Sequence, residues 1–185
     1  MNKRQKIIGI TGMPGVGKST LGRKLGERLD TAYVELSELL FTNLFEQCLY
    51  TPYGDGSDAY EILKENCKDK RFGGLFRKFL QDLGAKSREV DPNILLDSMT
   101  VLVKTKYDYI FGGVRDKEHA EYILDQGGVL FHILPGDFYK VDDRVADHKV
   151  EVSVPYPGSC IITNNNIITS VNEMLCYLEG FYGQD

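Results

Sequence analysis

The chain has 185 residues, 42% of them hydrophobic, which is enough for one domain with its own core. Its 22 basic residues are outnumbered by 27 acidic ones, and the formal net charge of -5 argues against a nucleic-acid partner. The 4 cysteines form no CxxC pair and there are only 3 histidines, so a zinc site or a disulfide framework is disfavoured. The apolar run 7–11 is too short for a signal peptide or a membrane span. We therefore expect a cytoplasmic protein without a membrane partner.

In the first part of the chain, a short apolar run and the pattern of one amphipathic helix precede a helix-rich block. The patterns predict strands at 7–11 and 32–35. They also predict helices at 18–29, 58–67, 71–83 and 91–104, and a further helix that has Ser37 as its N-cap and runs to about residue 45. A loop is predicted at 50–57, where Pro52 and two glycines cluster. Gly84 is expected to stop the helix at 71–83.

From residue 107 onward strand and helix patterns alternate. Strands are predicted at 107–111, 129–134 and 159–163, and helices at 116–126 and 170–181. This rhythm predicts an α/β fold of the P-loop NTPase type, with three layers (α/β/α) and a five-stranded parallel sheet. In the single domain 1–185, the block 37–104 is interpreted as a helical acceptor-binding insertion, and 136–150 as a short lid.

A glycine-rich loop follows the first predicted strand. Residues 12–19 read GMPGVGKS and match the pattern GxxxxGK[ST] between a buried strand and an amphipathic helix, the context that this motif requires. Its glycines allow successive N–H groups to face one phosphate, and the helix start adds a positive end. The motif predicts binding of ATP with Mg²⁺, with Ser19 as the metal ligand and these nucleotide-binding residues: Gly12, Met13, Pro14, Gly15, Val16, Gly17, Lys18, Ser19 and Thr20.

The companions of this loop favour a kinase over other P-loop proteins. No Asn-Lys-x-Asp element for guanine occurs, and the only acid of the strand 107–111, Asp108, lies at the end away from the expected site. That strand instead ends in Gly112-Gly113-Val114-Arg115. Arg115 can bind a phosphate in a bidentate fork, although a surface salt bridge with Asp116 or Glu118 is the alternative.

Three further groups are candidates of lower specificity. Arg77 and Gln81 share a helix face at i, i+4 and can point into a cleft, or form a solvated helix face. Arg144 lies in the predicted lid, which can also be a plain surface loop. Asn164 and Asn165 follow the last strand, where amides can read an adenine edge, but asparagines are also ordinary turn formers.

With these residues in place, the chain resembles the deoxynucleoside monophosphate kinases of tailed bacteriophages and the animal-type phosphomevalonate kinases. The resemblance rests on the phosphate loop, on RKFLQDLG at 77–84, on GAKSREVDP at 84–92, on GGVR at 112–115 and on IITN at 161–164. It implies that Lys18, Arg77, Arg88 and Arg115 contact phosphates, and that Asn164 frames the adenine. The sequence departs from these relatives at Ser19, Gly113 and His119, where acids are common.

The resulting hypothesis is ATP-dependent transfer of the γ-phosphoryl group to a (deoxy)nucleoside monophosphate. Lys18, Arg115 and Arg144 are the predicted catalytic residues, and the predicted substrate-binding residues are Ser37, Arg77, Gln81, Arg88, Arg115 and His119. The alternatives are a kinase of another small phosphorylated metabolite, of the phosphomevalonate or dephospho-coenzyme A type, and a non-enzymatic ATP-binding regulator. Small-molecule nucleotides are the expected partners, and a homodimer is left open.

Overall fold

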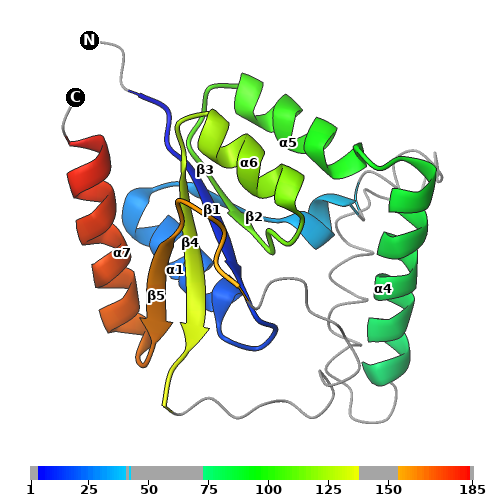
Figure 1. Ribbon diagram of the computed structural model, residues 1–185, viewed down its shortest axis with the longest axis horizontal. Coiled ribbons are helices and arrows are strands. Elements are labelled where there is room, and N and C mark those ends of the chain that lie inside the picture. The colour runs from blue at the N-terminus through cyan, green and yellow to red at the C-terminus, as the bar shows by residue number, and fades with distance from the viewer. Residues whose placement is uncertain (1–3, 41, 43–72, 138–153, 184–185) are drawn as a thin grey trace. The chain divides into compact units, whose positions relative to one another are not determined.

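The structure is a computed structural model that describes residues 4–40, 42, 73–137 and 154–183 (Figure 1). It divides the chain into two compact units, one made of Met1–Glu35 and Leu102–Asp185 and the other of Leu36–Val101. The second unit spans nearly the same residues as the predicted insertion. The predicted loop at 50–57, the helix at 58–67 and most of the lid at 136–150 lie outside the described residues.

The first unit is built on a five-stranded parallel sheet, as predicted. Its strands are β1 (Ile7–Gly12), β2 (Ala32–Glu35), β3 (Tyr109–Gly112), β4 (Val129–Pro135) and β5 (Cys160–Asn164), in the spatial order β2-β3-β1-β4-β5. Central strand β1 pairs with β3 and β4 and is buried along its whole length. Because all strands are parallel, their carboxyl ends meet at one edge, where ligands bind in such sheets.

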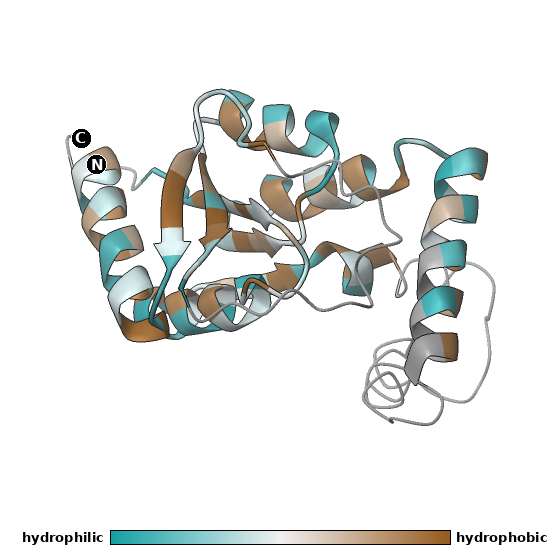
Figure 2. Ribbon diagram, turned by 60° about the horizontal axis from the view of Figure 1, so that its bottom comes forward, coloured by the Kyte–Doolittle hydropathy of each residue, from teal (hydrophilic) through white to brown (hydrophobic). Residues whose placement is uncertain are grey.

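Helices cover both faces of this sheet. Helices α1 (Lys18–Leu29) and α7 (Ile167–Tyr182) pack against each other on one face, while α6 (Lys117–Asp125) packs against β1 and β4. Neighbouring residues of β1 show the two sides: a Cβ on Gly9 would meet Ile123 of α6, whereas a Cβ on Gly22 of α1 would meet Ile10. Figure 2 shows the apolar residues concentrated along the strands. The three-layer prediction is therefore confirmed.

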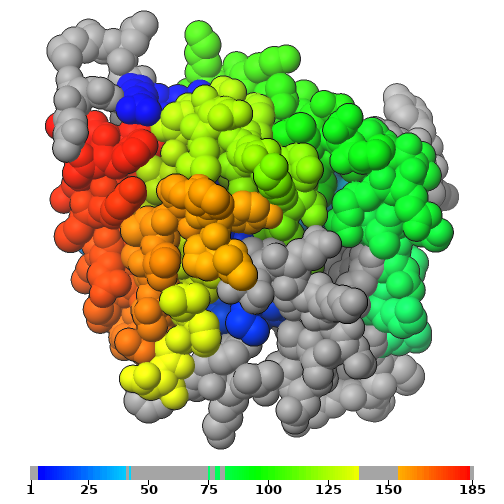
Figure 3. Space-filling view, in the orientation of Figure 1, coloured from blue at the N-terminus to red at the C-terminus, as the bar shows by residue number. Residues whose placement is uncertain are grey.

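Helix α7 begins three residues earlier than predicted and covers the β5 edge of the sheet. It starts after Asn166, whose side chain accepts hydrogen bonds from the N–H groups of Ile168 and Thr169, an N-cap that the sequence analysis missed. Its inner side buries Val171, Met174 and Leu178. Helix α7 and strand β5 lie side by side on the face seen in Figure 3. The exposed large apolar residues of these two elements include Ile161, Tyr177 and Phe181.

The second unit is helical where it is described. Residues 36–40 are helical, followed by α4 (Gly73–Val90) and by α5 (Ile94–Lys104), whose last residues belong to the first unit. Leu40, Ile94 and Leu95 form a small buried cluster. No helix in the described part of the chain is both long and apolar enough to cross a membrane.

Two predictions about helix ends in this unit are wrong. Helix α4 runs through Gly84. A glycine ends a helix when it adopts a left-handed conformation, and Gly84 is not among the glycines with positive φ. Ser37 lies inside the helix that starts at residue 36 and is therefore not its N-cap.

Two polar side chains are completely buried beneath the loop that follows β1. Thr11 of β1 and His132 of β4 are partners in the strand register, and both are 0% exposed. Within the described residues, neither the Thr11 hydroxyl nor the two ring nitrogens of His132 have a hydrogen-bond partner. Burial, with a smaller contribution from the charge of Lys18, lowers the pKa of His132 below its usual value.

This burial predicts an acid-sensitive fold. In the unfolded chain His132 takes up a proton as the pH falls through about 6.5, whereas the buried ring resists it. The free energy of unfolding should therefore fall as the pH drops below about 6.5. Urea unfolding at several pH values between 5 and 8 measures this, and His132→Leu should flatten the curve. An equally steep fall in the variant would contradict the prediction.

Candidate functional site

The phosphate loop has the backbone that its sequence predicts. Gly12, Gly15 and Gly17 have φ angles of 132°, 80° and 90°, in the region that favours glycine. A Cβ on Gly12 would lie 2.4 Å from the carbonyl oxygen of Ile133, so no larger residue fits there. Val16 is 3% exposed and belongs to the hydrophobic core. Because its apolar side chain is anchored below, the loop presents backbone groups rather than side chains to a ligand.

Lys18 lies over this loop at the start of α1. Its ammonium group donates a hydrogen bond of 2.6 Å to the carbonyl oxygen of Met13, within the loop itself. Burial and the nearby positive charge of Arg115 lower the pKa of Lys18 to about 8, while Glu35 opposes the shift. Lys18 is thus still charged at neutral pH, but its charge is poorly solvated. An anionic ligand at the loop would relieve that cost.

Glu35, the last residue of β2, is a site residue that the sequence analysis missed. Its Oε2 atom accepts a hydrogen bond of 2.9 Å from the hydroxyl of Ser19, the predicted metal ligand. Its charge also acts on Lys18. A signal was available, because an acid that ends a strand of a parallel sheet lies at the ligand-binding edge. Glu35 at the end of β2 meets this condition, whereas Asp108, the only acid of the strand predicted at 107–111, does not.

Tyr33 holds this carboxylate in place. Its hydroxyl donates a short hydrogen bond to Glu35 Oε2, and burial together with the Glu35 charge raises the pKa of the phenol. The ring lies where two glycines leave space, since a Cβ on Gly22 or Gly112 would clash with it. The guanidinium of Arg23 lies 5.4 Å from the ring centre. Tyr33 is therefore packed as part of the fold, rather than free to stack on a base.

Arg115 is at the same edge of the sheet. It follows β3 after Gly113, which has a φ of 71° and approaches Glu35 so closely that a Cβ there would lie 2.6 Å from Oε1. Its backbone carbonyl accepts a hydrogen bond from the Tyr156 hydroxyl at 3.1 Å. The Arg115 side chain is exposed, yet its charge lowers the pKa of Lys18. Arg115 thus lies beside the phosphate loop and remains accessible.

This arrangement fits ATP and Mg²⁺. The glycine loop, the α1 N-terminus and Lys18 form an anion site. Ser19 and Glu35 offer a hydroxyl and a carboxylate 2.9 Å apart, the oxygen ligands that Mg²⁺ prefers. Among the described residues there is no group of three or more His, Cys, Asp or Glu side chains able to hold a metal by themselves. A metal here would complete its shell with phosphate oxygens and water, as Mg²⁺ usually does.

The asparagines after β5 bind backbone groups. The amide of Asn164 donates to the Val16 carbonyl of the phosphate loop at 2.8 Å, and Asn165 Oδ1 accepts from the Asp137 N–H at 3.1 Å. Both contacts join parts of the chain that are far apart in the sequence. The prediction that these residues frame the adenine stays a prediction.

Of the other predicted substrate residues, the structure describes His119, Ser37 and Arg88. His119 is 4% exposed, and its Nδ1 lies 3.4 Å from the Asp116 carboxylate at the start of α6. Little of the ring is therefore exposed, and the substrate role of His119 stays a prediction. Ser37 and Arg88 are exposed residues of the second unit. Arg144 and the side chains of Arg77 and Gln81 lie outside what the structure describes.

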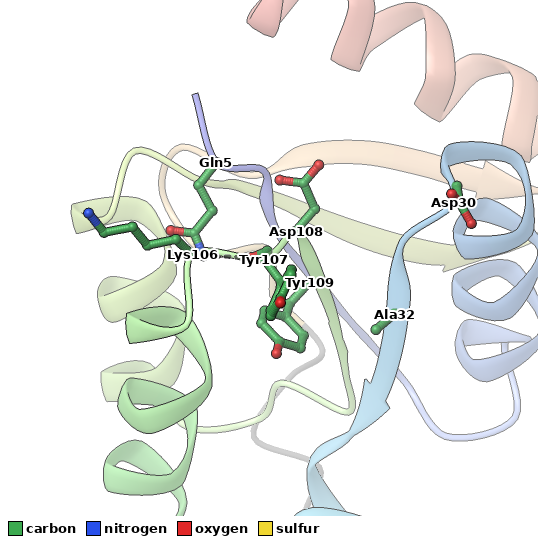
Figure 4. Close-up of a pocket in the computed structure, with 7 residues that line it drawn as sticks. All are labelled: Gln5, Asp30, Ala32, Lys106, Tyr107, Asp108 and Tyr109. Carbon is green, nitrogen blue, oxygen red and sulfur yellow. Dashed lines mark hydrogen bonds between the residues drawn. The ribbon is translucent and has the colours of Figure 1, made fainter. Parts of the chain in front are cut away.

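A separate shallow pocket of about 510 Å³ lies at the opposite end of the strands (Figure 4). It is lined by residues that precede or begin β1, β2 and β3, namely Gln5, Asp30, Ala32, Lys106, Tyr107, Asp108 and Tyr109. Asp108 accepts a hydrogen bond from the Lys6 N–H there. As predicted, this acid is far along the strand from the phosphate loop, and the pocket is not the candidate site.

Comparisons of the sequence give only partial matches. No protein-family model matches the chain. A segment of 64 residues, 35% of the chain, is 38% identical to a "Putative adenylate kinase" of Saccharolobus solfataricus, and this segment spans about a third (32%) of that relative. A 32-residue segment is 59% identical to a protein of the same description from Pyrococcus furiosus. An alignment of 181 residues, 96% of the chain, is 26% identical to a Lon protease of Clostridium beijerinckii and spans 18% of that relative.

Solved structures share the fold over the whole chain. A gluconokinase from Sinorhizobium meliloti aligns with 100% of the chain and 99% of its own, at a TM-score of 0.55 and 10% identity. A putative kinase from Chloroflexus aurantiacus covers 97% of this chain and 99% of its own, at a TM-score of 0.56 and 12% identity. The chain therefore has the α/β fold of P-loop kinases.

Proposed function

We propose that the protein transfers the γ-phosphoryl group of ATP to the phosphate of a (deoxy)nucleoside monophosphate, as a member of the nucleoside monophosphate kinase branch. One observation carries this proposal: Arg115 follows β3 beside the end of β1 that leads into the phosphate loop, since Gly112 pairs with Ile10 and the Val114 N–H donates to the Ile10 carbonyl at 3.2 Å. The accessible Arg115 and Lys18 thus lie at the same end of the sheet. Two anionic groups that must approach each other need such cations on both sides.

Each residue has a definite task in this proposal. The loop N–H groups and Lys18 bind the triphosphate, and Ser19 with Glu35 would hold Mg²⁺, which supplies charge neutralisation at the phosphates. Arg115 binds the acceptor phosphate in a fork. No general base is needed for this acceptor, because a phosphate oxygen is already an anionic nucleophile.

The comparisons support the donor half of the proposal more strongly than the acceptor half. The kinase fold and the phosphate loop agree on a nucleoside triphosphate as donor. The partial match to proteins described as adenylate kinases favours a nucleotide acceptor. The closer assignment to deoxynucleoside monophosphate kinases of the bacteriophage type rests on the sequence resemblance.

Glu35 favours a second candidate, the transfer of phosphate to a hydroxyl group of a small metabolite. A hydroxyl acceptor must lose its proton, and a carboxylate fixed by Tyr33 at the carboxyl end of β2 can accept it. A fixed negative charge also repels a phosphate acceptor unless a metal lies between them. Glu35 thus has a role with either acceptor, as a metal ligand or as a base.

An acceptor panel tests the proposal. Consumption of ATP should be measured with Mg²⁺ and each common ribo- and deoxyribonucleoside monophosphate, beside sugars, dephospho-coenzyme A and phosphomevalonate. We expect turnover only with the nucleoside monophosphates. Turnover confined to hydroxyl acceptors would establish the second candidate instead. Tight ATP binding without turnover on any acceptor would contradict both and leave a nucleotide-binding regulator.

Arg115→Ala gives a further prediction. Loss of a charged, bidentate contact should reduce kcat/KM for the acceptor by about fiftyfold, while the dissociation constant for ATP changes little. Initial rates at varied acceptor concentration, with isothermal titration calorimetry for ATP, measure the two effects. Arg28→Ala, which removes an exposed arginine from the far end of α1, is the matched control. An unchanged rate in Arg115→Ala would remove this residue from the mechanism.

A further inference from the structure

The carboxyl end of β5 is joined to the phosphate loop by one side chain, that of Asn164. The Asn164 amide donates to the Val16 carbonyl at 2.8 Å, a contact between residues 148 positions apart. The two parts also approach closely next to this bond, since a Cβ on Gly17 would lie 2.6 Å from Asn164 Nδ2. The asparagine is thus seated against the loop, at a place that only glycine can occupy.

The surroundings of Asn164 fix which end of its amide faces the loop. The Val16 carbonyl can only accept, so the NH₂ group must point toward it. The amide oxygen faces the other way and lies 3.5 Å from the hydroxyl of Ser170, which is 1% exposed. Ser170 also donates to the Thr163 carbonyl at 3.2 Å. The amide oxygen of Asn164 therefore faces the buried side chain of Ser170 in α7.

The bond to Val16 also controls its neighbour in the loop. A peptide unit is planar and trans, so its C=O and the following N–H point in opposite directions. When Asn164 holds the Val16 carbonyl, the N–H of Gly17 must point away from Asn164. Gly17 has a φ of 90° and directly precedes Lys18 and the first turn of α1. As a glycine, it would otherwise rotate more freely than any other residue.

We propose that Asn164 is a positioning residue of the phosphate loop, which presets the Val16–Gly17 peptide for a polyphosphate and does not read the base. Holding that peptide in its binding orientation removes an ordering cost that a ligand would otherwise meet. Asn164 should then raise the affinity for any triphosphate by the same factor. The inference rests on the phosphate-binding part of the proposed function and not on phosphoryl transfer.

Three ligands separate positioning from base recognition. The dissociation constants of ATP, GTP and inorganic tripolyphosphate are measured by calorimetry with Mg²⁺ for the wild-type protein and Asn164→Ala. The loss of one hydrogen bond to the loop should weaken all three by a common factor of about ten. An unchanged tripolyphosphate affinity together with weaker ATP binding would overturn the proposal in favour of base reading. No change for any ligand would overturn it as well.

Asn172→Ala, which removes an exposed asparagine of α7 that has no predicted contact with the ligand, is the matched control, and all three affinities should stay near wild type. Thermal unfolding without ligand reports whether each variant folds. Should Asn164→Ala not fold, Asn164→Ser keeps a polar group near Ser170 but is too short to reach Val16, and the same comparison applies. Wild-type protein that binds tripolyphosphate and transfers nothing would refute only the kinase activity. Wild-type protein that does not bind tripolyphosphate would refute this inference.

Discussion

Lys18→Met should lower kcat by at least about a thousandfold at saturating ATP and acceptor, because it removes the one side-chain cation within the phosphate loop. The same change should raise the melting temperature of the ligand-free protein. Burial lowers the pKa of Lys18 to about 8, so at pH 7 the charge is present in the fold at a cost that methionine does not carry. Coupled-enzyme rates and scanning calorimetry without nucleotide measure the two effects.

Lys24→Met is the control for this prediction. Lys24 is an exposed lysine of the same helix, paired with Glu27 at 2.6 Å, so its loss should leave rate and melting temperature nearly unchanged. The opposite movement of activity and stability in Lys18→Met excludes simple unfolding as the cause of inactivity. A rate within tenfold of wild type would show that the loop does not act on the transferred phosphate.

Glu35→Gln should reduce kcat by several hundredfold, on the order expected for a lost base or metal ligand. Glutamine keeps the size of the side chain and a hydrogen-bond acceptor for Ser19 and Tyr33, but not the charge. If Glu35 holds Mg²⁺, the Mg²⁺ concentration for half-maximal ATP binding should rise, for every acceptor. If Glu35 is a base, Mg²⁺-dependent ATP binding should be normal and only transfer to hydroxyl groups should fail.

Two further variants complete this test. Tyr33→Phe removes the hydroxyl that holds Glu35 and should give a smaller loss of the same kind, because the carboxylate remains but is less well placed. Glu173→Gln removes a carboxylate from an exposed position of α7 and should have no effect. Full activity of Glu35→Gln at low Mg²⁺ would exclude both roles of Glu35.

The features that depend only on neighbouring residues could be predicted from the sequence. The motif at 12–19 predicted its own backbone, because positive φ angles require glycines at fixed positions. The helix at 18–29 and the strand at 32–35 were predicted with correct bounds, since apolar spacing differs between the two elements. Five parallel strands followed from the alternation of strand and helix, which leaves few other topologies.

Which distant residues meet depends on how the whole chain packs, and this could not be predicted from local patterns. The strand order β2-β3-β1-β4-β5 cannot be predicted from the spacing of residues along the sequence. This order brings Glu35 close to Ser19, and Asn164 close to Val16. It also buries His119, one of the predicted substrate-binding residues. The physical reason is that a hydrogen bond across 148 residues depends on the packing of the whole sheet, whereas a glycine turn depends on the torsion angles of a few residues.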